Sequence, residues 1–133
     1  MPVYSHSYDS WHYDPAMPVV EIALLSPETG VSLIQLTALV DTGADATMLP
    51  ANVLEAAGAR YVQTLRLRGV TEQSLSVETF VTIVRLGPHT VYGVQAVAMP
   101  VGSEAIIGRD VLNELEITLN GPAHELWSNS KNL

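Results

Sequence analysis

The stretch Ala38-Leu-Val-Asp-Thr-Gly-Ala-Asp-Ala-Thr-Met-Leu-Pro50 decides the fold, with Asp41, Thr42 and Gly43 at its centre. The apolar residues before Asp41 predict a buried strand that ends at this aspartate. An acidic residue at the end of such a run is costly unless it is paired or used. Gly43 permits a tight turn, and the Thr42 hydroxyl can form a hydrogen bond locally or across an interface. The stretch predicts a loop that displays a functional carboxylate.

A second segment, Ala105-Ile-Ile-Gly-Arg-Asp-Val-Leu112, follows about 65 residues later and leads into Ile117-Thr-Leu-Asn120. Asp-Thr-Gly alone is a weak signal, because many turns produce it. Combined with Ala44 and Asp45 directly after it and with the later Ile-Ile-Gly-Arg, it resembles the active-site pattern of the retropepsins, the retroviral-type aspartic proteases. The resemblance covers roughly residues 19–121, and it implies the retropepsin fold and a peptidase activity that needs no metal or organic cofactor.

Composition narrows the function classes. A chain of 133 residues is long enough for one domain and too short for a two-lobed architecture. The net charge of −8 and only six Lys and Arg residues argue against a nucleic-acid partner. Cysteine is absent, which excludes disulfides and thiolate chemistry. No apolar run is long enough for a membrane span and no signal peptide is recognisable, so we expect no membrane association and a cytoplasmic location.

The pattern of short apolar runs separated by Gly and Pro predicts an all-β fold, either a barrel or a sandwich. The resemblance makes this a closed, retropepsin-like β-barrel, the half-lobe of an acid protease, with one or two short helices. The expected strands are residues 19–25, 31–40, 61–67, 76–86, 90–99 and 117–119, and the expected helices are residues 50–57 and 108–115.

The two ends of the chain lie outside the expected domain at 19–121. Residues 1–18 show no period of a helix or strand and are expected to form an arm without regular structure. This arm either lies on the domain surface or serves as a pro-segment or partner-docking arm. Metal binding by His6 and His12 is the least favoured alternative, because their spacing in an irregular arm fixes no ligand geometry. The tail, residues 122–133, either docks or is disordered.

Hydrolysis by carboxylates needs two of them, one that takes a proton from water and one that donates to the scissile carbonyl oxygen. The chain contains one Asp-Thr-Gly. A two-fold axis would supply the second carboxylate, because such an interface sets each residue opposite its own copy. We therefore expect a homodimer in which the two Asp41 side chains meet at the axis. The resemblance implies that Thr42 bonds across the interface and that terminal strands, residues 117–119 included, pair between subunits.

The resemblance also assigns supporting roles. Asp45 and Arg109 match an ion pair that links the active-site loop to the helix, and a planar guanidinium suits that role. The alternative is two independent surface charges. Asp110 stands where many retropepsins have Asn, and we expect it to cap or solvate the helix start rather than to act in catalysis.

Substrate contacts follow from alignment alone. The expected wall residues are Ala44, Asp45, Ala46, Gly69, Val70, Glu104 and Ile106. Glu104 replaces an apolar residue of the family, so an acidic wall would favour a basic or polar substrate side chain if Glu104 faces the cleft; alternatively it points to solvent. The predicted flap at residues 69–74 has one glycine and the charged Glu72, which implies a stiffer hairpin with a more polar tip.

The favoured function is therefore a homodimeric aspartic endopeptidase, in which two Asp41 carboxylates activate a water molecule to hydrolyse peptide bonds. The alternative is a catalytically weak or inactive module of the same fold that binds peptides or dimerises, because fold does not guarantee function. A third possibility is an enzyme that acts mainly on its own precursor through the N-terminal arm.

Overall fold

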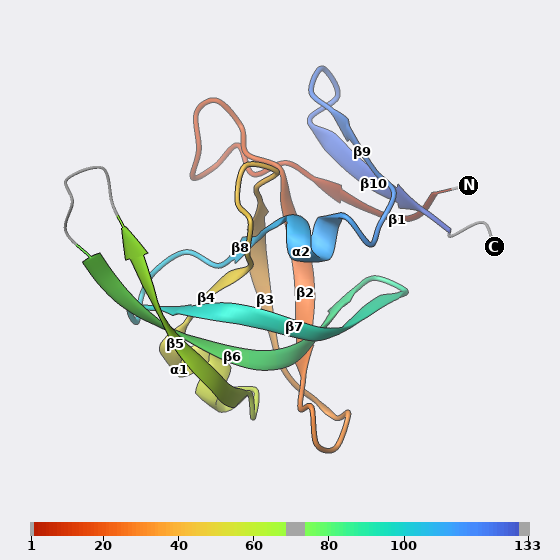
Figure 1. Cartoon of the computed structure of the whole chain (residues 1–133). Helices are drawn as coiled ribbons and strands as arrows, with labels where there is room; N and C mark the ends of the chain where they lie inside the picture. Colours follow the sequence, from red (N-terminus) through yellow and green to blue (C-terminus); the bar gives the residue numbers. More distant parts are fainter. Residues whose placement is uncertain (1, 69–73, 131–133) are drawn as a thin grey trace.

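The computed structural model describes residues 2–68 and 74–130. Within these residues seven strands form one sheet in the order β2-β3-β8-β4-β7-β6-β5, and an additional pairing of β2 with β6 closes it into a barrel (Figure 1). The predicted all-β, closed-barrel fold is confirmed. The strands of this sheet are β2 (Val19–Leu25), β3 (Ser32–Val40), β4 (Met48–Pro50), β5 (Arg60–Arg68), β6 (Ser74–Leu86), β7 (His89–Met99) and β8 (Ile106–Ile107).

The short helix α1 (Ala51–Ala56) forms where the sequence predicts it. Pro50 precedes its first residue, a position at which a residue without an N–H donor costs nothing. Gly58 follows the helix with a φ of +68°, a left-handed conformation that favours glycine and ends the helix. Leu54 is the buried residue that anchors α1 to the barrel. The second helix, α2 (Arg109–Leu112), is shorter than the predicted 108–115.

The hydrophobic core fills the barrel and continues beneath the small helices and the chain ends. Strand β2 is buried at every position except Glu21, because it pairs with β3 and β6 and is also covered by the N-terminal segment. The largest fully buried apolar side chains are Ile22, Leu24, Leu49, Leu54, Leu86, Ile107 and Leu126. A core residue as late as Leu126 shows that the end of the described chain belongs to the same folding unit.

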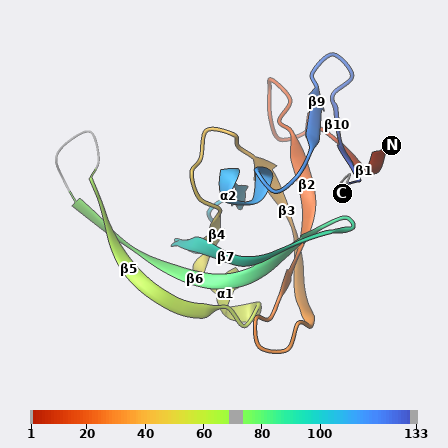
Figure 2. The same cartoon turned by 45° about the vertical axis from the view of Figure 1, so that its right-hand side comes forward.

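Both chain ends form regular structure, in a second sheet of three strands beside the barrel (Figures 1 and 2). The sheet has the order β1-β10-β9, with the strands β1 (Pro2–Ser7), β10 (Glu125–Asn129) and β9 (Ile117–Asn120). The expectation of an irregular N-terminal arm is therefore wrong for Pro2–Ser7. The tail docks through β10, which pairs with β1 and β9. Local sequence does not reveal β1, because its partner β10 lies more than one hundred residues away, whereas β10 also pairs with the nearby β9.

Strand β1 is fastened to the barrel as well as to β10. The Tyr4 side chain packs against the core, and its hydroxyl accepts a hydrogen bond of 3.0 Å from the Glu21 backbone N–H. Burial raises the pKa of the Tyr4 phenol, so the hydroxyl stays protonated at neutral pH. Gly87, in the turn between β6 and β7, has no side chain that would strike the Tyr4 ring; a Cβ there would lie 2.8 Å from Tyr4 Cδ2.

Two further observations concern function classes. In the part of the chain that the structure describes, no helix is long and apolar enough to cross a bilayer. In the same part, no three His, Asp or Glu side chains gather closely enough to hold a metal ion.

The docked C-terminal strand leads to a stability prediction. Leu126→Ala should lower the free energy of unfolding by about 2–5 kcal/mol, because it leaves a cavity in the shared core. Leu33→Ala, at a residue that is half exposed, is the matched control and should change it by less than about 1 kcal/mol. Urea denaturation followed by tryptophan fluorescence measures both. Equal small effects for the two variants would contradict the integration of β10 into the core.

Candidate active site

Asp41 lies directly after β3, in a tight turn that the backbone and its own side chain define. The Asp41 N–H donates to the Ile107 carbonyl at 3.0 Å, which joins the start of the turn to β8. The Ala44 N–H donates to the Asp41 carbonyl at 3.2 Å, and the Gly43 N–H donates to Asp41 Oδ1 at 2.9 Å. One carboxylate oxygen of Asp41 is thus held by a hydrogen bond from the backbone of its own loop, two residues further along the chain.

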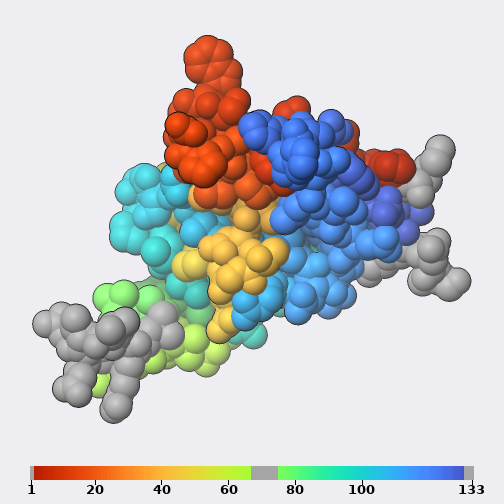
Figure 3. Space-filling model, turned by 90° about the horizontal axis from the view of Figure 1, so that it is seen from above, coloured from red at the N-terminus to blue at the C-terminus, as the bar shows by residue number. Residues whose placement is uncertain are grey.

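The loop faces outward. Asp41 is partly buried, whereas Thr42 and Gly43 are exposed. Figure 3 shows the loop, in yellow-orange, at the surface between the N-terminal segment and the blue C-terminal part. Among the described residues, no hydrogen bond joins the Asp41 carboxylate to a second carboxylate. A single chain therefore presents one acidic group on an open surface.

Arg109, the first residue of α2, braces this loop. Its backbone N–H donates to the Ala44 carbonyl at 2.9 Å, and its guanidinium donates to the Thr42 carbonyl at 2.7 Å. The guanidinium also forms an ion pair with the Asp45 carboxylate. The side chains of Arg109 and Asp45 are 42% and 89% exposed, so water screens their attraction in the single chain. The fixed geometry comes mainly from the hydrogen bonds to the backbone of the loop.

A buried hydrogen-bonded group lies beneath the loop and was not predicted. Thr47 is fully buried, and its hydroxyl and backbone N–H donate to the Asp110 carboxylate at 2.8 and 3.0 Å. The Gly108 N–H in turn donates to the Thr47 hydroxyl at 3.3 Å. Asp110 therefore ties α2 to the segment before β4, and its Oδ1 also accepts a hydrogen bond of 3.0 Å from the Val111 N–H at the start of α2. A threonine between Ala46 and Met48 carries no sequence pattern that would reveal this role.

Gly108 allows these two segments to approach. A Cβ at Gly108 would lie 2.7 Å from the Ala46 carbonyl carbon and oxygen, which is closer than side-chain carbons come to backbone. The absence of a side chain lets the Gly-Arg segment pass directly under the Asp41 loop. The pattern Ile-Ile-Gly-Arg is thus a packing requirement of the loop.

The structure brings together only some of the expected wall residues. Ile106 pairs with Leu39 and Met48, beside the end of β3 at Asp41. Ala44 and Asp45 continue the loop itself. Ala46 lines a separate depression with β7 and Asp110, away from Ile106. Gly69, Val70 and Glu72, and with them the predicted flap tip, lie outside the described residues.

Glu104 has a partner that sequence did not suggest. Its carboxylate accepts a hydrogen bond from the Tyr13 hydroxyl, 91 residues earlier in the chain. This contact raises the pKa of Tyr13 to about 12. Both residues line a partly open cavity of about 410 Å³ between the N-terminal segment and β3. A larger cavity of about 550 Å³ between β1 and the β6–β7 hairpin is lined by none of the predicted site residues.

The structure combines a closed β-barrel with an Asp-Thr-Gly loop at the end of one strand, and a Gly-Arg segment supports this loop. This combination defines the half-lobe of an acid protease. The family model for aspartyl proteases matches residues 30–111, which include both segments. The chain belongs to the aspartyl protease family, and the predicted retropepsin relationship is confirmed. A search of curated protein sequences found no significant match.

Solved structures with the same fold include a retropepsin-like aspartic protease from Rickettsia conorii. It is 10% identical, the alignment covers 96% of this chain and 92% of that chain, and the TM-score is 0.59. EIAV protease, complexed with the inhibitor HBY-793, is 25% identical over 74% of this chain and 86% of that chain, with a TM-score of 0.49. The likeness to the Rickettsia protein shows the retropepsin-like fold.

The close approach at Gly108 leads to a second prediction. Gly108→Ala should lower the free energy of unfolding by about 1–3 kcal/mol, because backbone cannot move aside as a flexible side chain can. Gly121→Ala, where no atom lies within 4 Å of the added Cβ, is the matched control and should change it little. Thermal unfolding by circular dichroism measures both. Indistinguishable unfolding temperatures would show that the two segments are not in contact.

Proposed function

We propose that this chain is a homodimeric aspartic endopeptidase in which Asp41 of each subunit forms one half of the catalytic pair. The observation that carries the proposal is the isolated, outward-facing Asp41 in a loop fixed from below by Arg109. Thr42 and Gly43 shape the loop. Peptide or protein chains are the substrates, and no cofactor takes part.

The chemistry follows from placing two carboxylates a few ångströms apart. Such a pair does not ionise completely in one step, because each negative charge opposes the other. The ionised member takes a proton from a water molecule, and that water attacks the peptide carbonyl carbon. The protonated member donates its proton toward the carbonyl oxygen, which gives a tetrahedral intermediate. Protonation of the amide nitrogen and breakage of the C–N bond then release the two products.

The dimer provides what the single chain does not. An isologous interface places Asp41 opposite its own copy only if the axis passes beside the loop. The exposure of Thr42 and Gly43 supports an interface there, since both are uncovered in one chain. Strand β9 pairs with β10 along one edge, and a second subunit would pair along its other edge. The pairing of β1 with β10 means that Pro2–Ser7 already has a partner within the chain.

Removal of the proposed catalytic carboxylate is the direct test. Asp41→Asn should reduce kcat by about 10²-fold or more, because the amide can neither take nor donate the proton. Glu55→Gln, on the exposed face of α1, is a control for the loss of one charge and should keep activity. A peptide-library assay read by mass spectrometry measures both variants. Activity of Asp41→Asn comparable to wild type would remove Asp41 from the mechanism.

Shared catalysis also predicts a dependence on concentration. Activity per chain should fall when the protein is diluted below the dimer dissociation constant. In that range the total rate becomes proportional to the square of the protein concentration. Sedimentation velocity at the same concentrations should show monomer and dimer populations that follow the activity. A monomer with constant activity per chain would exclude a shared site. A stable dimer that binds peptides and cleaves none would favour the inactive binding module.

A further inference from the structure

The segment between β1 and β2, residues 9–17, forms a loop with its own internal order, here named the N-terminal loop. Asp9 and Met17 exchange two backbone hydrogen bonds, of 2.8 and 3.0 Å, that close it. The Asp9 carboxylate accepts hydrogen bonds from the backbone N–H groups of Trp11 and His12, at 2.9 and 3.0 Å. The hydrogen bond from His12 N–H is the main reason why the pKa of Asp9 is lowered. The loop therefore has a defined shape from which Tyr13 can reach out.

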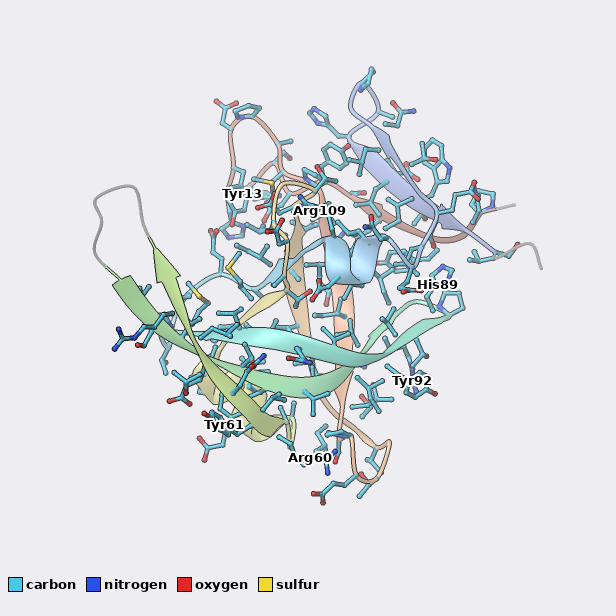
Figure 4. All side chains as sticks on the ribbon, in the orientation of Figure 1. Tyr13, Arg60, Tyr61, His89, Tyr92 and Arg109 are labelled. Atoms are coloured by element: carbon cyan, nitrogen blue, oxygen red, sulfur yellow. The ribbon has the colours of Figure 1, made fainter. Side chains whose placement is uncertain are left out.

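Tyr13 connects this loop to the segment that leads into β8. Its hydroxyl donates to Glu104 Oε1. In Figure 4 Tyr13 and Arg109 are both labelled in the upper part of the view, where Figure 1 shows the loop between β3 and β4. The raised pKa of Tyr13 means that the phenol keeps its proton far above neutral pH. The donor is thus present at any pH at which the chain would work.

The cavity beside this contact lies on the face of β3 that leads to Asp41. Side chains two residues apart share one face of a strand, so Thr37 and Leu39 point to the same side of β3, and Asp41 follows directly after the end of this strand. Both Thr37 and Leu39 line the cavity, together with Glu104 and Tyr13. Leu39 is two residues before Asp41, or about 7 Å along an extended chain. A peptide bound at Asp41 would place one of its side chains within reach of this cavity.

We propose that Tyr13 is a positioning residue that fixes the Glu104 carboxylate in this cavity, and that the cavity accepts a basic side chain, Lys or Arg, of the substrate. The proposal rests on the proposed peptidase function, since it names the substrate class of that site. Tyr13 occupies Oε1 of Glu104, and Oε2 is the oxygen that would receive an ammonium or guanidinium group. None of the described residues that line the cavity is Lys or Arg, and its one histidine, His12, has its ring Nδ1 hydrogen-bonded to Asp9 at 2.9 Å.

The test compares peptides that differ only by Lys or Met, two side chains of similar length, at each position around the cleaved bond in turn. Wild type should favour Lys at one position by about two- to fivefold in kcat/KM, the size expected of one partly exposed ion pair. Glu104→Gln should remove this preference. Tyr13→Phe should weaken it through KM, with kcat nearly unchanged, because the carboxylate remains but is no longer fixed.

Tyr92→Phe is the matched control for the loss of a phenol hydroxyl. Tyr92 is 74% exposed on β7, away from the cavity, and this variant should keep the Lys preference of wild type. A second readout does not depend on cleavage. The pKa of Tyr13 is obtained by subtracting the tyrosine titration of a Tyr13→Phe protein from that of the same protein with Tyr13. Measured in this way in wild type and in Glu104→Gln, the pKa of Tyr13 should fall from about 12 toward its ordinary value of 10.0 when Glu104 is replaced.

The outcomes separate this inference from the proposed function. Equal cleavage of Lys and Met peptides by wild type at every position, or an unchanged preference in Tyr13→Phe, would overturn the role of Tyr13 and Glu104 while leaving the peptidase intact. If wild type cleaves no peptide, the proposed function fails, and binding of the same peptides then decides the inference. A Kd about two- to fivefold lower for the Lys peptide, lost in Glu104→Gln, would support it; equal Kd values would overturn it.

Discussion

The structure depends on one close contact, the passage of Ile107, Gly108 and Arg109 beneath the Asp41 loop. The Ile107 carbonyl receives the Asp41 N–H, and Arg109 holds two carbonyl groups of the same loop. The bonds from the Asp41 N–H and the Arg109 N–H set backbone against backbone, which the missing side chain of Gly108 permits, whereas the Thr42 carbonyl is held by the Arg109 guanidinium. Thr47 and Asp110 satisfy the polar groups that this approach buries. Since unpaired buried donors are costly, the loop has little freedom to adopt another shape. The position of the Asp41 carboxylate is therefore set by the packing of two segments that are distant in sequence.

The second sheet changes how the two ends of the chain relate to a dimer. Strand β10 lies between β1 and β9, so the N-terminal strand is satisfied within its own subunit. Strand edges with unpaired N–H and C=O groups readily pair with another chain. The outer edge of β9 has no strand partner among the described residues, and it leaves a place for a second copy without an exchange of chain ends. In such an assembly each subunit would fold independently before the two half-sites meet.

Much of this fold was predictable from the sequence, and the failures have clear physical causes. Continuous apolar residues predict strands such as Val19–Leu25. Pro50 and Gly58 predict the two ends of α1. The Asp41 loop and Gly108 follow from local motifs. In contrast, Pro2–Ser7 is a strand because it pairs with Glu125–Asn129, and no local pattern records a partner across the whole chain. Thr47 and Tyr13 were missed for the same reason: each is a common polar residue whose role is set by one distant carboxylate.

The exposed ion pair of Asp45 and Arg109 links loop geometry to assembly. In one chain the pair is largely in water, where such pairs contribute about 0–1 kcal/mol. A second subunit at this surface would remove water from it, and the attraction between the charges would strengthen as the local dielectric falls. Removing water from charges also has a cost, which is offset only when their hydrogen bonds are satisfied. The Arg109 guanidinium holds the Thr42 carbonyl as well as Asp45, but it has further N–H donors beyond these two bonds. Burial of this contact by a second subunit would therefore stabilise the assembly only if that subunit supplied acceptors for the remaining donors.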